Sequence, residues 1–225
     1  LDAPPFELLG CLSLCAAVHR ASGGAFDPTV QPLWALHALR QAEGRPPSAA
    51  EIAAVLPRTG WDGVRFDEAQ VRLARPGMAL TLNGVAQGLV ADRVAALLGR
   101  EGLTDVLIDM GEIRAPSGRP DGAPWTVALR GPGGPIPGPV PLRAAALATS
   151  APLGTTFDEE GRSGHILDPR TGEPVAARWR SATITAPEAG LADALSTAAC
   201  GLAEAGIAAM LAAFPGAAAV RLLAA

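Results

Sequence analysis

The 225-residue sequence contains no lysine, so arginine alone supplies its permanently positive side chains. A chain without lysine cannot build a P-loop, whose lysine reaches the terminal phosphates of a nucleotide, and cannot form a Schiff base. The formal net charge is −4, and no run of basic residues offsets it. We therefore expect no nucleic-acid partner, because nucleic-acid binding relies on clustered positive charge.

Cysteine is scarce, with three residues in the chain. This odd count does not make a disulfide framework and leaves at least one thiol unpaired. Cys11 and Cys15 stand four residues apart in an apolar run, so on a helix they would share one face. That face is either buried or binds a metal, and we favour burial because no other soft ligand lies nearby in the sequence.

Long hydrophobic runs are missing as well, and the longest is too short to span a bilayer. The first residues do not show a basic segment followed by an apolar segment and a cleavage site of small residues. Because the sequence starts at LDAPPFELL, without methionine, we expect that a signal or a membrane anchor could precede it.

The composition that remains is 49% apolar and 18% charged, with 26 glycines and 21 prolines, which indicates a globular protein with many turns. Periodicity predicts helices over residues 6–20, 29–41, 46–60, 83–102 and 189–206, then a last helix–strand pair. Strands are predicted over 64–66, 70–73, 78–82, 105–111, 124–132, 143–150, 164–169 and 180–186. Residues 112–123 and 131–141 are predicted loops, the second a hairpin loop.

The order of these elements favours an α+β fold in a single domain over residues 1–225. We expect a mixed, largely antiparallel sheet with flanking helices, because many neighbouring strands lie too close in sequence for crossover helices. Ser48 and Glu51 are spaced as a capping box at the start of the third helix.

The segment LTLNGVAQGLVADRV leads from a predicted strand directly into a helix, with Asn83 and Gly84 at the junction. The free N–H groups of a helix N-terminus can bind a phosphate. Alternatively, Asn83 only caps the helix, and the segment by itself does not decide between the two. The glycine fingerprint of dinucleotide-binding folds is absent, so a Rossmann site is not supported.

Asp193 and Thr197 stand four residues apart on a predicted helix, so both oxygen ligands project from one face. A hard cation such as Mg²⁺ accepts a carboxylate and a hydroxyl together with a backbone carbonyl, water and substrate phosphate. In the alternative, Thr197 bonds back into its own helix and Asp193 complements the helix dipole. Taken alone, the spacing favours this second, structural interpretation.

His165 precedes a rigid turn and could act as a general base near neutral pH, or serve as a hydrogen-bonded structural residue. For a lone histidine we favour the structural role. His19 and His37 lie on predicted helices without a polar cluster, so no role is assigned to them. Asp109 and Glu112 lie at a strand-to-loop junction, either near a site or on the surface.

The stretch SGGAFDPTVQPLW, residues 22–34, holds more than a connector between two helices needs. A glycine and a polar residue would suffice for the turn. The additional Phe26-Asp27 pair therefore indicates a loop that holds a ligand.

Seven blocks, read in order, resemble one known family. The blocks are GGAFDPTVQPLW, LTLNGVAQGLVADRVAALL, DMGEIRA, PDGAPWTV, ALATS, GHILDPRTGEP and ADALSTA. Together they closely resemble the ApbE family of FAD:protein FMN transferases, which includes homologues called NosX. The resemblance runs over nearly the whole chain and covers the later and larger part of the family domain, so we expect that the family's N-terminal portion is missing here.

This resemblance implies an ApbE-like, magnesium-dependent enzyme that binds FAD, transfers FMN to a threonine or serine hydroxyl of an acceptor protein and releases AMP. It also implies a periplasmic location, with a possible membrane anchor outside this chain. By the same resemblance, the FAD contacts would be Ala25, Phe26, Asp27, Thr81, Gln87 and Leu167; the metal ligands would be Asp193, Thr197 and the Gly84 carbonyl; and His165 would be the catalytic base.

Two other functions stay open. A FAD-binding carrier or maturation partner would use the same pocket, and Thr81 favours it because the family often has an acidic residue there. Retention of Asp193, Thr197 and His165 argues against it, since storage of FAD needs no base. A FAD pyrophosphatase would need the same metal and differ only in letting water attack.

Overall fold

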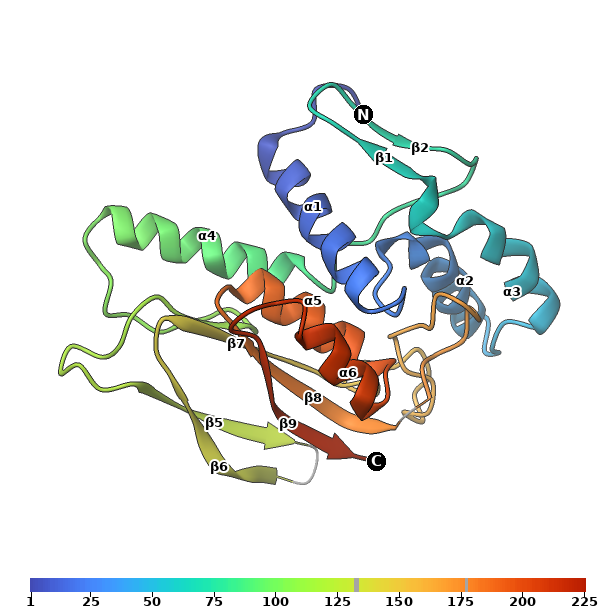
Figure 1. Cartoon of the computed structure of the whole chain (residues 1–225). Coiled ribbons are helices and arrows are strands. Elements are labelled where there is room, and N and C mark those ends of the chain that lie inside the picture. Colours follow the sequence, from blue (N-terminus) through green and yellow to red (C-terminus); the bar gives the residue numbers. More distant parts are fainter. Residues whose placement is uncertain (132–133, 177) are drawn as a thin grey trace.

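The computed structural model describes residues 1–131, 134–176 and 178–225 (Figure 1). Its helices are α1 (Phe6–Ala21), α2 (Gln31–Ala42), α3 (Ala49–Val55), α4 (Ala86–Arg100), α5 (Ala189–Cys200) and α6 (Glu204–Leu211). Its strands are β1 (Val64–Phe66), β2 (Val71–Leu73), β3 (Ile108–Asp109), β4 (Ile113–Ala115), β5 (Trp125–Gly131), β6 (Gly134–Leu142), β7 (Ala145–Ser150), β8 (Trp179–Ala186) and β9 (Ala218–Ala224). Short 3-10 turns are η1 (Pro28–Val30), η2 (Leu56–Arg58) and η3 (Trp61–Gly63).

The main sheet has the strand order β3-β4-β7-β8-β9, and its described pairs are antiparallel. Two antiparallel ribbons, β1–β2 and β5–β6, stand outside it. Short connections such as those joining β3 to β4 and β5 to β6 allow this pattern without crossover helices. The expected fold class, α+β with a largely antiparallel sheet and flanking helices, is confirmed.

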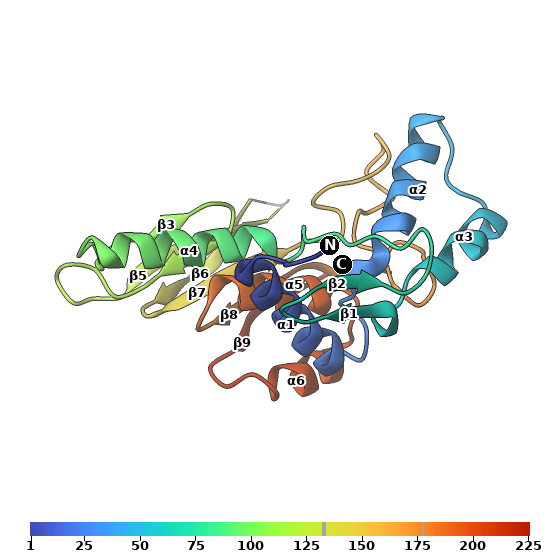
Figure 2. The ribbon, with the colours of Figure 1, turned by 90° about the horizontal axis from the view of Figure 1, so that it is seen from above.

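The central strand β7 is buried on both faces because a different layer packs against each. Ala146 and Ala148 contact the alanine-rich faces of α4 and α5, whereas Leu147 packs against the β5–β6 ribbon. Small side chains on the helix side let α5 lie close to the strands. Figures 1 and 2 show α4 and α5 over the sheet, and Figure 2 shows α2 and α3 at the opposite end of the molecule from β3.

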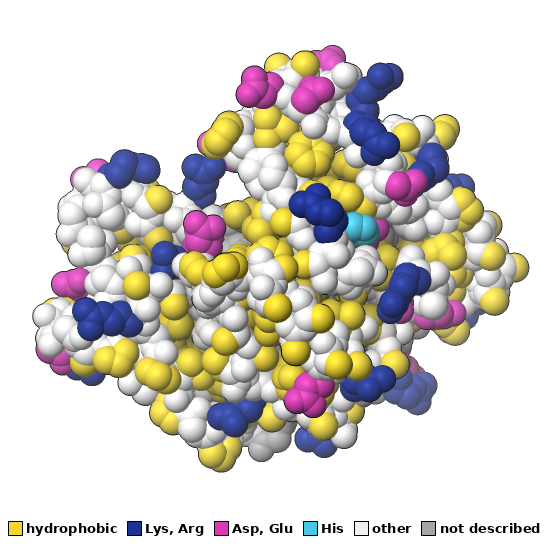
Figure 3. Space-filling model, viewed as in Figure 1, with side chains coloured by type: hydrophobic (Ala, Val, Ile, Leu, Met, Phe, Trp, Pro, Cys, Tyr) yellow, Lys and Arg dark blue, Asp and Glu magenta, His cyan; other side chains and the backbone are white. Residues whose placement is uncertain are grey.

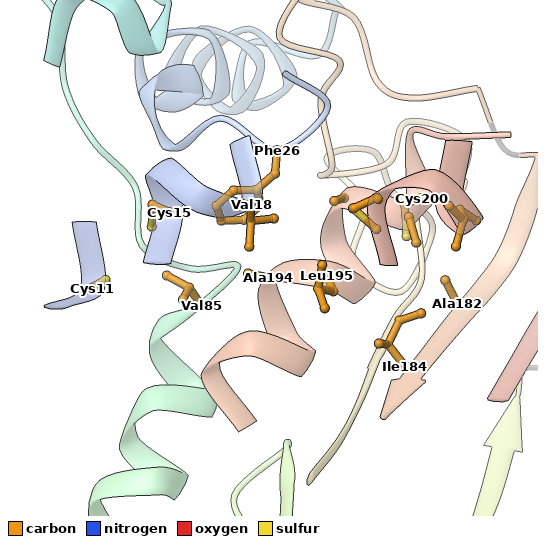
Figure 4. Close-up of a cluster of buried hydrophobic side chains, with 14 residues drawn as sticks. Cys11, Cys15, Val18, Phe26, Val85, Ala182, Ile184, Ala194, Leu195 and Cys200 are labelled. Carbon is orange, nitrogen blue, oxygen red and sulfur yellow. The ribbon is translucent and has the colours of Figure 1, made fainter. Parts of the chain in front are cut away.

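The largest buried cluster joins α1, α5 and α6 to the main sheet, and Figure 4 shows the side chains that meet there. Cys11, Cys15 and Cys200 are free, buried thiols within it, which confirms burial for the first two. Phe26 enters the same cluster from the loop that follows α1. The packing of this cluster therefore anchors the segment that the sequence indicated as a ligand loop.

Two predicted strands are wrong. Residues 78–82 belong to none of the described sheets, and the N–H of Thr81 donates instead to the carbonyl of Pro28 in a loop, at 2.8 Å. Residues 164–169 form only isolated bridges, at Gly164 and Leu167. The turn that begins at Asp168, closed by the Gly172 N–H at 2.8 Å from the Asp168 carbonyl oxygen, interrupts regular pairing there.

Other predicted elements differ in their bounds, three of them in ways that change the assignment of a segment. The predicted loop 112–123 contains β4, and most of the predicted hairpin loop forms β6, although residues 132–133 lie outside the described residues. Within the described pairs β6 bonds to β5 alone, and an edge strand tolerates proline because its outer N–H groups need no partner. The helix predicted over 189–206 ends at Cys200, and α6 begins at Glu204.

Across the described ranges no helix is long and apolar enough to cross a membrane. On the face shown in Figure 3, arginine and acidic side chains are interspersed rather than gathered into a basic stripe. Hydrophobic side chains lie between them over much of that face.

Candidate active site

A cavity of about 320 Å³ opens where the loop after α1, the start of α4, the end of β7 and the face of α5 meet. All ten positions assigned through the resemblance line it: Ala25, Phe26, Asp27, Thr81, Gly84, Gln87, His165, Leu167, Asp193 and Thr197. They come from segments far apart in the sequence. The structure therefore brings the whole predicted set together, and the role of each residue stays a prediction.

The loop after α1 reverses the chain at two glycines. Gly23 and Gly24 have φ values of +59° and +83°, which residues with a side chain rarely adopt. The reversed segment is held by Ser22 Oγ, which accepts from the Phe26 N–H at 3.1 Å, and by His19 Nδ1, 2.9 Å from the Phe26 carbonyl oxygen. Because a carbonyl only accepts, His19 Nδ1 carries the proton. His19, to which the sequence assigned no role, therefore supports the loop.

Asp27 is buried, and hydrogen bonds within the fold engage both of its carboxylate oxygens. Oδ1 accepts from the N–H and the hydroxyl of Thr29 at 2.8 and 2.6 Å, and Oδ2 accepts from the Trp61 N–H at 3.1 Å. Thr29 Oγ1 in turn accepts from the Gly60 N–H at 2.6 Å. Asp27 therefore ties the cavity loop to the turn at residues 60–61.

Helix α4 begins later than expected, with Val85 as an N-cap that supplies no side-chain bond. Asn83 therefore does not cap it. Instead, the Gly88 N–H in its first turn donates to Asp193 Oδ2, at 3.2 Å, so a carboxylate on α5 faces the positive end of α4. A Cβ at Gly88 would lie 2.2 Å from the Ala189 carbonyl oxygen, so only glycine permits this close approach.

Thr197 follows Asp193 by one turn of α5 and lines the same cavity. Within the described residues its hydroxyl bonds to Ser150 Oγ on β7, at 3.2 Å, and not to its own helix. The back-bonding alternative for Thr197 is therefore wrong. A Cβ at Gly84 would lie 3.1 Å from Thr197 Oγ1 and 3.3 Å from the Phe26 ring, so glycine keeps the backbone beside that hydroxyl.

These groups fit a hard divalent cation. In the described part of the chain no hydrogen bond engages Asp193 Oδ1, and Thr197 and the Gly84 backbone add neutral oxygens beside it. Mg²⁺ prefers such oxygen donors and usually keeps several waters. No three His, Cys, Asp or Glu side chains gather around one point among the described residues. A cation would therefore depend on hydroxyl, carbonyl, water and substrate oxygens beyond the Asp193 carboxylate.

His165 is partly exposed on the cavity wall, and its Nδ1 lies 2.8 Å from the carbonyl oxygen of Thr155. Because that oxygen only accepts, Nδ1 carries the proton, and Nε2 of the neutral ring keeps its lone pair. A fixed tautomer with a free Nε2 is the arrangement that a general base requires.

Besides Asp27, two other buried carboxyls lie in the cavity wall, those of Asp193 and Glu112. Burial raises the pKa of Asp193 to about 6. Burial and the nearby charge of Asp193 raise the pKa of Glu112 to about 8. Glu112 Oε2 has no hydrogen-bond partner among the described residues. Glu112 therefore belongs to the cavity, whereas Asp109, from the same junction, is exposed.

Three other predicted FAD contacts, Gln87, Thr81 and Leu167, also line the cavity. Gln87 Nε2 donates to the Met110 carbonyl at 3.1 Å, which fastens α4 to the turn after β3. The Thr81 backbone is held by the loop after α1, and Leu167 is buried. These contacts define where the three side chains lie, and FAD binding by each of them stays a prediction.

Sequence reasoning missed Ser150 and did not place Glu112, although both line the cavity. A polar residue that ends a buried strand was the available signal for Ser150. His37, for which no role was expected, has Nε2 2.8 Å from the Gly172 carbonyl oxygen. It therefore ties α2 to the loop that also contains His165.

Known proteins are similar to this chain in sequence and in fold. The family model of the ApbE family matches residues 3–221. The FAD:protein FMN transferase of Treponema pallidum is 32% identical over 235 residues, covering 91% of this chain and 64% of its own length. That of Haemophilus influenzae is 29% identical over 193 residues, covering 80% and 56%. The chain thus spans between about half and two thirds of these curated relatives.

Solved structures of ApbE proteins have a fold similar to that of this chain. The flavinyl transferase ApbE of Pseudomonas stutzeri, in its apo form, matches with a TM-score of 0.80 and 29% identity, covering 93% of this chain and 66% of that chain. The ApbE protein of Thermotoga maritima matches with a TM-score of 0.84 and 30% identity, over 98% and 74%. The fold is therefore that of the flavinyl transferase structures. By its match over residues 3–221, the chain belongs to the ApbE family.

Proposed function

We propose that this protein is an FAD:protein FMN transferase, which moves FMN from FAD to a threonine or serine hydroxyl of an acceptor protein and releases AMP. The observation that supports it most directly is the meeting of Asp193, Thr197, Gly84 and His165 in one cavity. Curated relatives that are FAD:protein FMN transferases add support from sequence. A carrier would need neither a base with a fixed tautomer nor a carboxylate left open to a cation.

The proton and the leaving group can be followed atom by atom. His165 Nε2 takes the proton of the acceptor hydroxyl, since the Thr155 carbonyl holds the proton of the ring on Nδ1. The hydroxyl oxygen then bonds to the phosphorus on the FMN side of the pyrophosphate. The bond from that phosphorus to the bridging oxygen breaks, and the bridging oxygen leaves with AMP.

Asp193, Thr197 and the Gly84 carbonyl would hold Mg²⁺, which when bound neutralises charge that builds on the leaving phosphate. The buried side chains of Phe26 and Leu167 exclude water from their part of the cavity. Exclusion of water favours the protein hydroxyl over hydrolysis.

The test is incubation of the protein with FAD, MgCl₂ and an acceptor domain that contains one threonine. Intact mass would show covalent FMN, and chromatography would show AMP. We expect both products, and neither after EDTA treatment or in Asp193→Asn. AMP without covalent FMN would instead establish a FAD pyrophosphatase, and FAD bound unchanged would establish a carrier.

The periplasmic or membrane-anchored location implied by the resemblance stays a prediction. Cell fractionation with antibodies against the native protein would test it. Recovery in the cytoplasmic fraction would contradict it.

A further inference from the structure

Two hydroxyls, those of Ser150 and Ser196, link the two residues proposed as side-chain metal ligands. Ser196 Oγ lies 3.0 Å from the carbonyl oxygen of Asp193, and Ser150 Oγ lies 2.7 Å from Ser196 Oγ. Thr197 Oγ1 lies 3.2 Å from Ser150 Oγ. Ser196 is fully buried, and Ser150 comes from the end of β7, so the chain of hydroxyls joins α5 to the central strand of the sheet.

Counting protons sets the direction of each of these hydrogen bonds. A carbonyl oxygen only accepts, so Ser196 donates its one hydroxyl proton to Asp193. Ser196 can then only accept from Ser150, whose proton is thereby used. Ser150 in turn can only accept, and its donor is Thr197. The donors therefore run in the order Thr197, Ser150, Ser196, and the chain ends on the Asp193 carbonyl.

This direction matters for Thr197 because a free hydroxyl rotates and can point either its proton or its lone pairs at a neighbour. With the proton held toward Ser150, the lone pairs of Oγ1 are available to the cavity that Thr197 lines. A proton directed into the cavity would instead repel a cation.

We propose that Ser150 and Ser196 are positioning residues that orient the Thr197 hydroxyl for ligation of a divalent cation. This inference rests on the proposed function, because it concerns the metal that the proposed transferase would use. Groups that orient a metal ligand typically change metal affinity by about 10–100-fold when they are removed.

A matched control is available on the same strands. The hydroxyls of Thr149 and Thr183 bond to each other at 2.9 Å between β7 and β8, and Thr183 is fully buried but does not line the cavity. Thr183→Val therefore removes one hydroxyl hydrogen bond between strands and leaves Thr197 untouched, whereas Ser150→Ala removes two, those to Ser196 and Thr197. A general loss of packing would affect both variants alike.

The experiment measures Mn²⁺ binding to the purified protein without FAD, by electron paramagnetic resonance, with calorimetric Mg²⁺ titration as a second readout. We expect Ser150→Ala to weaken Mn²⁺ binding about 10-fold or more, and Thr183→Val to change it less than about 2-fold. Ser196→Ala should also weaken Mn²⁺ binding, because Ser150 is then free to donate its proton toward Thr197. The effect should be smaller than that of Ser150→Ala, because Ser150 is still present to accept the Thr197 proton. In a Thr197→Val background, Ser150→Ala should have no further effect.

Two results would overturn the proposal. One is equal Mn²⁺ affinity in Ser150→Ala and Thr183→Val, and the other is an undiminished effect of Ser150→Ala in the Thr197→Val background. Either result leaves the proposed function standing if Asp193→Asn and Thr197→Val still weaken binding. If the wild-type protein binds no Mn²⁺, or those two variants bind it as the wild type does, the metal site and the proposed mechanism fail as well.

Discussion

Asp27 and Asp193 line the same cavity and are buried to nearly the same degree, with exposed fractions of 7% and 4%. Their carboxylates are nevertheless used differently. Among the described residues, the Asp27 carboxylate accepts hydrogen bonds from three donors on Thr29 and Trp61, whereas the Asp193 carboxylate accepts one, from Gly88. Burial by itself therefore does not mark a carboxylate that is available for chemistry. A carboxylate is available for chemistry when an oxygen that faces a cavity has no hydrogen-bond donor within the fold.

The difference follows from where each residue lies along the chain. Asp27 is the N-cap of η1, directly before a proline, so a nearby N–H group is free for its side chain. Asp193 lies within α5, where the backbone N–H groups are taken by the helix itself. Its partners must come from other elements, and Gly88 on α4 supplies one.

Of the changes predicted here, replacement of Asp193 should have the largest effect, and that effect is on activity. Asp193→Asn should lower transfer activity roughly 10³-fold or more, because several kcal/mol of metal-assisted charge stabilisation are lost and each 1.36 kcal/mol is tenfold. The amide keeps an acceptor for the Gly88 N–H, so the variant should unfold at no lower a urea concentration than the wild type. Initial rates of AMP release would measure the first effect. Activity within tenfold of the wild type would contradict the assignment of Asp193.

His165→Ala should have the second largest effect, a decrease of roughly 10²-fold in the rate of transfer, within the usual range for loss of a general base. The decrease should be smaller than that of Asp193→Asn, since the metal supplies both positioning and charge stabilisation. The same AMP assay, repeated with added imidazole, checks it, and imidazole should restore part of the rate. A His165→Ala enzyme slower than Asp193→Asn would reverse the proposed order.

Asp27→Ala should affect stability more than Mn²⁺ binding. It leaves the Thr29 and Trp61 donors without their acceptor in a buried turn, which should destabilise the protein by roughly 2–3 kcal/mol. Urea unfolding followed by circular dichroism measures the free energy of unfolding. A Mn²⁺ affinity lowered as much as in Asp193→Asn, with unchanged stability, would show that the two carboxylates do not differ as the hydrogen bonds indicate.

The smallest effect is expected at Glu112. In the folded protein the pKa of its carboxyl is raised to about 8, whereas in an unfolded chain the carboxyl ionises near pH 4.5. The folded state therefore loses stability as the pH rises between these values. Glu112→Gln should remove that loss and stabilise the protein by about 1–2 kcal/mol at pH 8, because the partly unpaired amide offsets some of the gain.

Thermal unfolding at pH 4 and pH 8 tests this prediction. At pH 4 the carboxyl is protonated in both states, so the gain from Glu112→Gln should disappear there. Mg²⁺ should also reduce the gain at pH 8, since a cation near the cavity wall favours ionised carboxyls. A gain of equal size at both pH values would show that the charge of Glu112 is not its cause.

Local signals were enough to predict several elements. The capping box of Ser48 and Glu51 is present, and β1 and nearly all of α1 were predicted with their observed bounds. Each depends on neighbours in sequence alone. The predictions failed where pairing with another segment decides: β6 pairs through glycine and proline residues because β5 lies beside it, and residues 78–82 have no partner strand among the described residues.

For the candidate site, the sequence by itself determined which oxygens share a helix face, since the spacing of Asp193 and Thr197 follows from helical geometry. Only the tertiary structure decided that both carboxylate oxygens of Asp27 accept hydrogen bonds, that Asp193 Oδ1 accepts none from the described residues, and that the Thr197 proton faces Ser150. The physical reason is that these hydrogen bonds join residues far apart in the sequence. Asp193 meets its donor 105 residues away in sequence, Thr197 meets Ser150 47 residues away, and Asp27 reaches Trp61 34 residues away.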